Sequence, residues 1–63
     1  MIMKEIDEEI GNLIEKEFKA IGKVLAIAPI GKNTFEVLVD IETVETRYIA
    51  FIGPNNTIGH WKL

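Results

Sequence analysis

The sequence predicts an α+β fold, with one N-terminal helix packed on a four-stranded antiparallel meander sheet. Before Gly22, apolar residues recur at gaps of three and four, which is helical spacing; after it, apolar and polar residues alternate, which is strand spacing. Clusters of turn-forming residues interrupt the second part at short intervals. Because the chain has 63 residues, we expect one domain that covers residues 1–63.

The predicted helix covers residues 3–20. Acidic residues follow Asp7, whereas Lys16 and Lys19 occupy the last turns, and both placements suit the dipole of a helix. Asp7 is an alternative N-cap, which would start the helix later. Gly22 is a residue at which a helix readily stops.

Four strands are predicted after the helix, joined by short hairpins. The turns between them are GKNT at 31–34, the polar cluster ETVE at 42–45, and GPNN at 53–56. The predicted strands cover residues 23–30, 35–41, 46–52 and 57–62.

The register of this sheet predicts a second apolar face. If each loop has four residues, Asp40 lies opposite Arg47, as opposite charges should. One face is then almost wholly apolar, and we expect the helix to cover it. The other face also collects apolar side chains, although a solvated face would be polar. Its predicted interface residues are Leu25, Ile27, Leu38, Ile49, Phe51, Ile58 and His60. A register error of one residue would move residues between faces, and this alternative stays open.

The second apolar face predicts association. A contiguous exposed apolar patch usually marks an interaction site. A chain this short has a small core, and without cysteine it forms no disulfide, so oligomerisation is the remaining way to bury more surface. We therefore expect a homodimeric protein-interaction or accessory module without catalytic activity, with another protein as the alternative partner. Both stacked faces and paired edge strands are open as dimer geometries.

A second hypothesis is a binder of small apolar ligands. Phe18, Tyr48 and Trp61 would line a pocket between helix and sheet, with Tyr48 and Trp61 as cross-strand neighbours. Small residues in the strands would leave room there. Gly11, at the edge of the helix's apolar stripe, would let a second helix or the sheet approach closely.

The residue types offer little for catalysis or for a cofactor. The chain has no serine or cysteine to act as nucleophile, and its single histidine, His60, excludes a multi-histidine metal site within one chain. Glu17 projects into the middle of the helix's apolar stripe, where a packed stem with a solvated carboxylate is the simpler interpretation. We therefore expect no enzymatic activity, no metal site and no cofactor.

Composition and charge indicate the class of partner and the cellular location. The net charge of −3 disfavours nucleic acid as a partner, and no apolar run is long enough for a membrane helix. The acidic N-terminus does not resemble a signal peptide, so we expect a cytoplasmic protein. Absence of serine, glutamine and cysteine, with abundant isoleucine, glutamate and lysine, is typical of hyperthermophile proteins.

The stretches GKVLAIAPIGKNTFEVLVD (22–40) and TRYIAFIGPNNTIGHWKL (46–63) resemble PepSY-like domains, and the order of a helix and four strands resembles the cystatin and monellin layout. DIETVE at 40–45 is similar to a late strand of the gas-vesicle O family. The chain departs from these patterns in its GPNN turn and in lacking an arginine-rich ending. The PepSY resemblance implies inhibition or regulation of peptidases, with no functional residue carried over.

Overall fold

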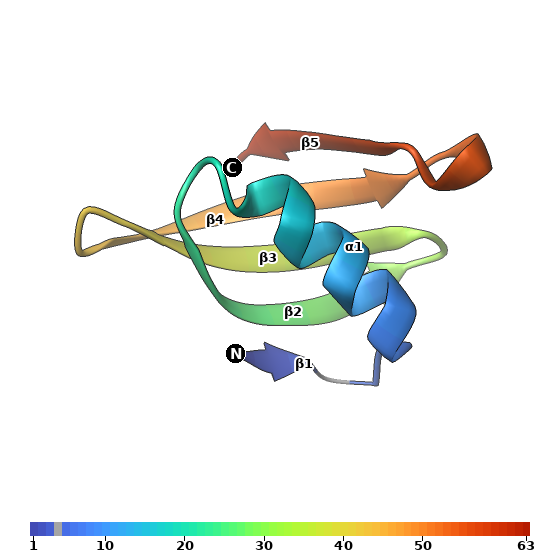
Figure 1. Cartoon of the computed structure of the whole chain (residues 1–63), viewed down its shortest axis with the longest axis horizontal. Helices are drawn as coiled ribbons and strands as arrows, with labels where there is room; N and C mark the ends of the chain where they lie inside the picture. Colours follow the sequence, from blue (N-terminus) through green and yellow to red (C-terminus); the bar gives the residue numbers. More distant parts are fainter. Residues whose placement is uncertain (4) are drawn as a thin grey trace.

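The computed structural model describes residues 1–3 and 5–63 and has a helix packed across one face of a five-stranded sheet (Figure 1). The strands follow one another across the sheet in chain order, so β1 and β5 form its two edges. The elements are β1 (Ile2–Met3), α1 (Glu8–Phe18), β2 (Lys23–Gly31), β3 (Thr34–Ile41), β4 (Val44–Ile52), the short helical turn η1 (Pro54–Asn56) and β5 (Ile58–Lys62).

The α+β class is confirmed, but the sheet is mixed rather than purely antiparallel. β1, which was not predicted, pairs in parallel with β2 and places Ile2 beside Ala26 and Met3 beside Ile27. A parallel pair needs a crossover connection, and α1 provides it. The prediction of a helix from residue 3 is therefore wrong; Lys4, which that range included, lies outside the described residues.

The helix begins where its capping chemistry dictates. Asp7 has an extended backbone, and its side chain accepts the N–H of Glu9 at 2.8 Å, so the alternative N-cap is the correct one. At the other end, the carbonyl of Phe18 accepts the N–H groups of Ile21 and Gly22. Gly22 has no positive φ, but a Cβ there would collide with the carbonyl oxygen of Asp40. Gly22 therefore permits a close approach to β3. It does not end the helix in the left-handed conformation that the sequence suggested.

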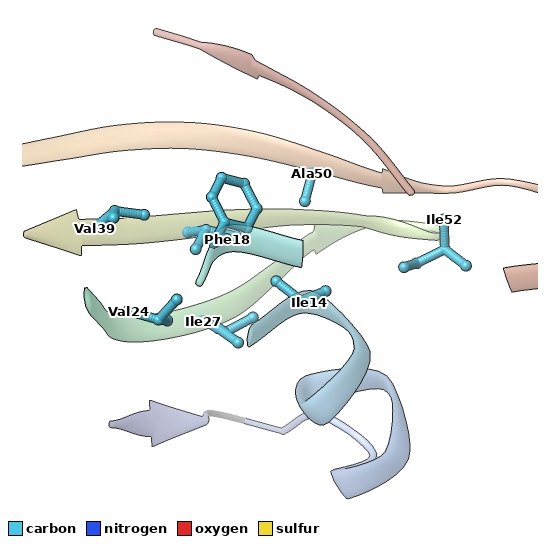
Figure 2. Close-up of a cluster of buried hydrophobic side chains, with 8 residues drawn as sticks. Ile14, Phe18, Val24, Ile27, Val39, Ala50 and Ile52 are labelled. Atoms are coloured by element: carbon cyan, nitrogen blue, oxygen red, sulfur yellow. The ribbon is translucent and has the colours of Figure 1, made fainter. Parts of the chain in front are cut away.

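The core lies between α1 and the sheet (Figure 2). Ile14 and Phe18 point from the helix onto the strands and have no exposed surface. The strand residues beneath them are Val24, Ile27, Val37, Val39, Ala50 and Ile52.

The hairpin between β3 and β4 is tighter than predicted. Ile41 pairs with Val44 around the two-residue turn Glu42–Thr43, not with Thr46 around a four-residue loop. Consequently Arg47 lies opposite Leu38, and the predicted Asp40–Arg47 pair is wrong. The observed register differs from the predicted one by two residues. Because this number is even, every side chain on β3 and β4 lies on its predicted face.

In β2 an irregularity moves residues to the other face. Val24 pairs with Val39 and Ala26 with Leu38, so Leu25 has no partner in the ladder. This extra residue turns Ile27 toward the helix, where it has no exposed surface. The predicted place of Ile27 on the second face is therefore wrong.

The connection between β4 and β5 is one residue longer than predicted, and this extra residue moves the side chains of β5 to the opposite face of the sheet. A five-residue connection pairs Ile52 with Ile58, instead of with Thr57. Ile58 and His60 therefore lie on the helix side, and Trp61 lies on the far side. The prediction that Tyr48 and Trp61 are neighbours on the helix face is wrong for this reason.

Candidate functional site: the open sheet face

The sheet face opposite α1 carries a band of apolar side chains across all five strands. We call it the open face. Cross-strand partners point to the same side of a sheet, so the register assigns its members. The apolar residues of the open face are Ile2, Ala26, Ala28, Leu38, Ile49, Phe51 and Trp61.

The exposed aromatic side chains of the open face lie on β4 and β5. Phe51 is 45% exposed and Trp61 is 54% exposed. Ile49 lies directly across from Trp61 and is only 8% exposed, so it is largely covered although no helix lies over it. Two large aromatic side chains exposed on one face are unusual, because aromatic residues are normally part of a core or an interface.

One ion pair lies within the open face. Nε of Arg47 is 3.6 Å from Oε2 of Glu36, and both side chains are substantially exposed. The two residues are diagonal neighbours on adjacent strands, between Leu38 and Ile49. Positive and negative charge therefore lie side by side in the middle of an apolar surface.

The seven predicted interface residues do not all lie on the same face of the sheet. Leu38, Ile49 and Phe51 lie together on the open face, as predicted from the alternation in β3 and β4. Leu25 is the unpaired residue in β2 and is half-buried. The remaining three, Ile27, Ile58 and His60, lie on the helix side.

Four members of the open face were not predicted: Ile2, whose strand was not expected, and Ala26, Ala28 and Trp61. For Ala26 and Ala28 the cause is the irregularity at Leu25, for which the sequence has no glycine as a signal. For Trp61 the cause is the length of the connection after Ile52. Pro54 and the two asparagines that follow it indicate a turn, but they do not fix whether four or five residues are looped out.

A second cluster lies on the helix side, where His60 lies beside Phe18, Tyr48 and Glu17. Its ring lies 4.9 Å from Phe18 and 5.9 Å from Tyr48, centroid to centroid. Its Nδ1 is 3.6 Å from Oε2 of Glu17. An imidazole beside a carboxylate supplies two of the three members of a nucleophilic triad, but the chain has neither serine nor cysteine to act as the third. The contacts join β5 to the end of α1, and we interpret the cluster as packing.

The aromatic pocket of the ligand hypothesis is not formed by its three predicted residues. Phe18 and Tyr48 pack edge to face at 5.2 Å, and Phe18 is fully buried. Trp61 lies on the opposite side of the sheet. A groove between helix and sheet does exist, of about 710 Å³, but its lining is different: Asn12, Glu15, Lys16, Lys19, Gly22, Lys23 and Val24.

Among residues 1–3 and 5–63, no group of three or more histidine, aspartate or glutamate side chains is arranged to hold a metal ion. Over the same residues, no helix combines the length and the apolar character needed to cross a membrane.

The chain matches no protein-family model, no curated protein and no solved structure. The resemblance to PepSY-like domains therefore stays a prediction.

Proposed function

We propose that the protein is a homodimeric interaction module without catalytic activity, and that two copies associate through their open faces. The observation that carries this proposal is the exposure of Phe51 and Trp61 beside Leu38 and Ile49, on a face that no element within residues 1–3 and 5–63 covers. Exposed apolar patches of this kind mark interaction sites more often than solvated surface.

A second copy is favoured as the partner because the open face is complementary to itself. In a two-fold dimer the same patch meets its own copy. The Glu36–Arg47 pair can then exchange partners, so that each arginine faces a glutamate of the other copy. Such an exchange keeps both charges paired when water leaves the interface.

The size of the open face indicates the strength of this association. Strands about 4.8 Å apart and about 20 Å long give a face of roughly 400–500 Å². Two such faces bury roughly 800–1,000 Å², which is at the low end for a specific interface. We therefore expect a dissociation constant in the range of about 1–100 μM.

Two variants on the same strand test the proposal. Phe51→Glu places a charge in the open face and should raise the dissociation constant at least about tenfold. Val44→Glu is the matched control, since Val44 is 62% exposed but points to the helix side, opposite Ile41. It should leave the constant unchanged within about twofold. Sedimentation velocity measures both, with circular dichroism to establish that each variant is folded.

Exchanging the charges of Arg47 and Glu36 provides a second test, in which no apolar residue is replaced. Arg47→Glu should weaken the dimer because two glutamates then meet across the two-fold axis. Adding Glu36→Arg to that variant restores one positive and one negative charge, and should restore dimerisation. Equal dissociation constants for the original chain, Phe51→Glu and Arg47→Glu would contradict the proposal.

A further inference from the structure

The two edges of the sheet are not equally protected against pairing with another strand. At one edge, β1 covers Ala26 and Ile27 of β2, and the part of β2 that follows contains Pro29 and a register irregularity. Proline and irregularities both hinder the addition of a strand. At the other edge, β5 runs beside β4 in one continuous register, contains no proline, and is exposed after Ile58. The edge formed by β5 is therefore the one that can accept another strand.

Hydrogen bonds at the two ends of β5 show which of its backbone groups point outward. The N–H of Leu63 donates to the carbonyl of Arg47 at 2.9 Å, and the N–H of Gly53 donates to the carbonyl of Thr57 at 2.7 Å. In an antiparallel pair, residues bonded to the neighbouring strand alternate with residues that are not. The residues whose N–H and C=O groups point away from β4 are therefore Ile58, His60 and Lys62. No strand in the described part of the chain lies beyond them.

The outward backbone groups of β5 are complementary to those of a second copy. In a two-fold antiparallel pair centred on His60, this residue lies opposite its own copy and Ile58 lies opposite Lys62. Each outward N–H and C=O then has a hydrogen-bond partner. Moving the centre by one residue in either direction leaves Ile58 or Lys62 without a partner in the strand, so the backbone favours this register.

The side chains on the open face fit the same register. Gly59 then lies opposite Trp61 of the second copy, in a pair without hydrogen bonds, where side chains lie closest. A Cβ at Gly59 would have no described atom within 4 Å, so there is room above this residue. Trp61 is 54% exposed. An aromatic side chain that covers a glycine of the neighbouring edge strand is a recognised way to stabilise such a pair.

We propose that the β5 edges of two copies pair in this register and join their sheets. A second copy is the partner because the same residues supply both sides of every contact. Edge pairing goes beyond the stacking of open faces and does not require it, since the backbone groups involved lie at the rim of the sheet. Because β5 is short, we expect a dissociation constant of about 2–10 mM, weaker than that of the open faces.

NMR spectroscopy at about 5 mM tests the register directly. The chain carries Arg47→Glu, which weakens the stacking of open faces, and ¹³C-labelled chain is mixed with unlabelled chain. We expect a nuclear Overhauser effect between chains that joins Hα of Gly59 to Hα of Trp61, because the two Cα atoms are about 4.5 Å apart in such a pair. On dilution, the amide shifts of Ile58, His60 and Lys62 should change more than those of Gly59 and Trp61.

A backbone substitution tests the outward hydrogen bonds. Lys62→Pro, in the same Arg47→Glu chain, removes an N–H that makes no bond to β4, so it leaves that ladder intact. Lys62→Ala is the matched control, because it removes the same side chain and charge but keeps the N–H. Lys62→Pro should raise the dissociation constant about five- to tenfold relative to Lys62→Ala, measured by translational diffusion. The amide shift of Leu63 establishes that β5 is still paired with β4.

Two outcomes would overturn edge pairing. The first is the absence of the contact between Gly59 and Trp61 at 5 mM, about the expected dissociation constant. The second is an equal dissociation constant for Lys62→Pro and Lys62→Ala. If the original chain forms dimers at micromolar concentration while either outcome is found, edge pairing alone is wrong. If the contact is found in a chain whose open faces do not associate, the stacking of open faces alone is wrong.

Discussion

At the scale of single residues, Gly11 shows how the absence of a side chain makes room for a residue of the edge strand β1. The glycine is buried within α1, and a Cβ there would collide with Sδ of Met3. Met3 packs against the core from β1. The close approach that the sequence predicted at Gly11 is therefore confirmed, and the approaching element is the short first strand.

A double-mutant cycle tests this contact. In an ordinary helix, Gly→Ala stabilises by about 1 kcal/mol. We expect that gain from Gly11→Ala only when Met3→Ala is also present, and a loss or no change in the otherwise unaltered chain. The coupling free energy should be about 1–2 kcal/mol, measured by urea unfolding. Additive effects of the two substitutions would show that Met3 does not pack on Gly11.

The turn between β3 and β4 stores strain in two residues. Glu42 and Thr43 have φ values of 50° and 69°, and a β-branched residue such as Thr43 is rarely found in this left-handed region. Two-residue hairpin turns with positive φ at both positions favour Asn-Gly. Because Glu-Thr is not a recognisable turn of this type, the sequence predicts a longer loop.

Replacing the strained pair tests its geometry. Glu42→Asn with Thr43→Gly should raise the free energy of unfolding by about 1–2 kcal/mol. Asn33→Gly in the β2–β3 turn is the control, since asparagine already tolerates its φ of 57° and the gain should be smaller. Thermal unfolding at fixed protein concentration measures both; destabilisation by the Asn-Gly pair would contradict the two-residue turn.

At the scale of elements, the helix and four of the strands were predictable because each contains several periods of its pattern. The ladder between β3 and β4 contains no inserted residue, so Leu38, Ile49 and Phe51 were assigned to the correct face. β1 was not predictable, since Ile2 and Met3 are too few residues to show alternation and also fit the helical spacing that follows. The faces of β2 and β5 depended on one extra residue each, and side-chain alternation reverses with every such insertion.

Two isoleucines on β2 test the observed register of that strand. Ile27 is fully buried under the helix, whereas Ile30 is 56% exposed. Ile27→Val should therefore lower the free energy of unfolding by about 1 kcal/mol, and Ile30→Val should change it by less than about 0.5 kcal/mol. Urea denaturation of the two variants side by side provides the comparison, and a larger loss from Ile30→Val would refute the placement of Ile27.

At the scale of the whole molecule, a single helix covers one face of the sheet, and no element within residues 1–3 and 5–63 covers the other. A domain of this size has few apolar residues to spare, yet Phe51 and Trp61 remain substantially exposed on the open face. Burial of that face between two copies would add to the core that α1 provides. The stability of the folded chain should then rise with protein concentration, as mass action requires for a dimer.

The molecular mass in solution tests the central claim most directly. Sedimentation equilibrium over about 1 μM to 1 mM brackets the expected dissociation constant. The average mass should rise with concentration from 7.1 kDa, the mass of one chain, toward twice that value, and Phe51→Glu should shift this rise to higher concentration. A mass that stays at 7.1 kDa up to the highest concentration would contradict association through the open face.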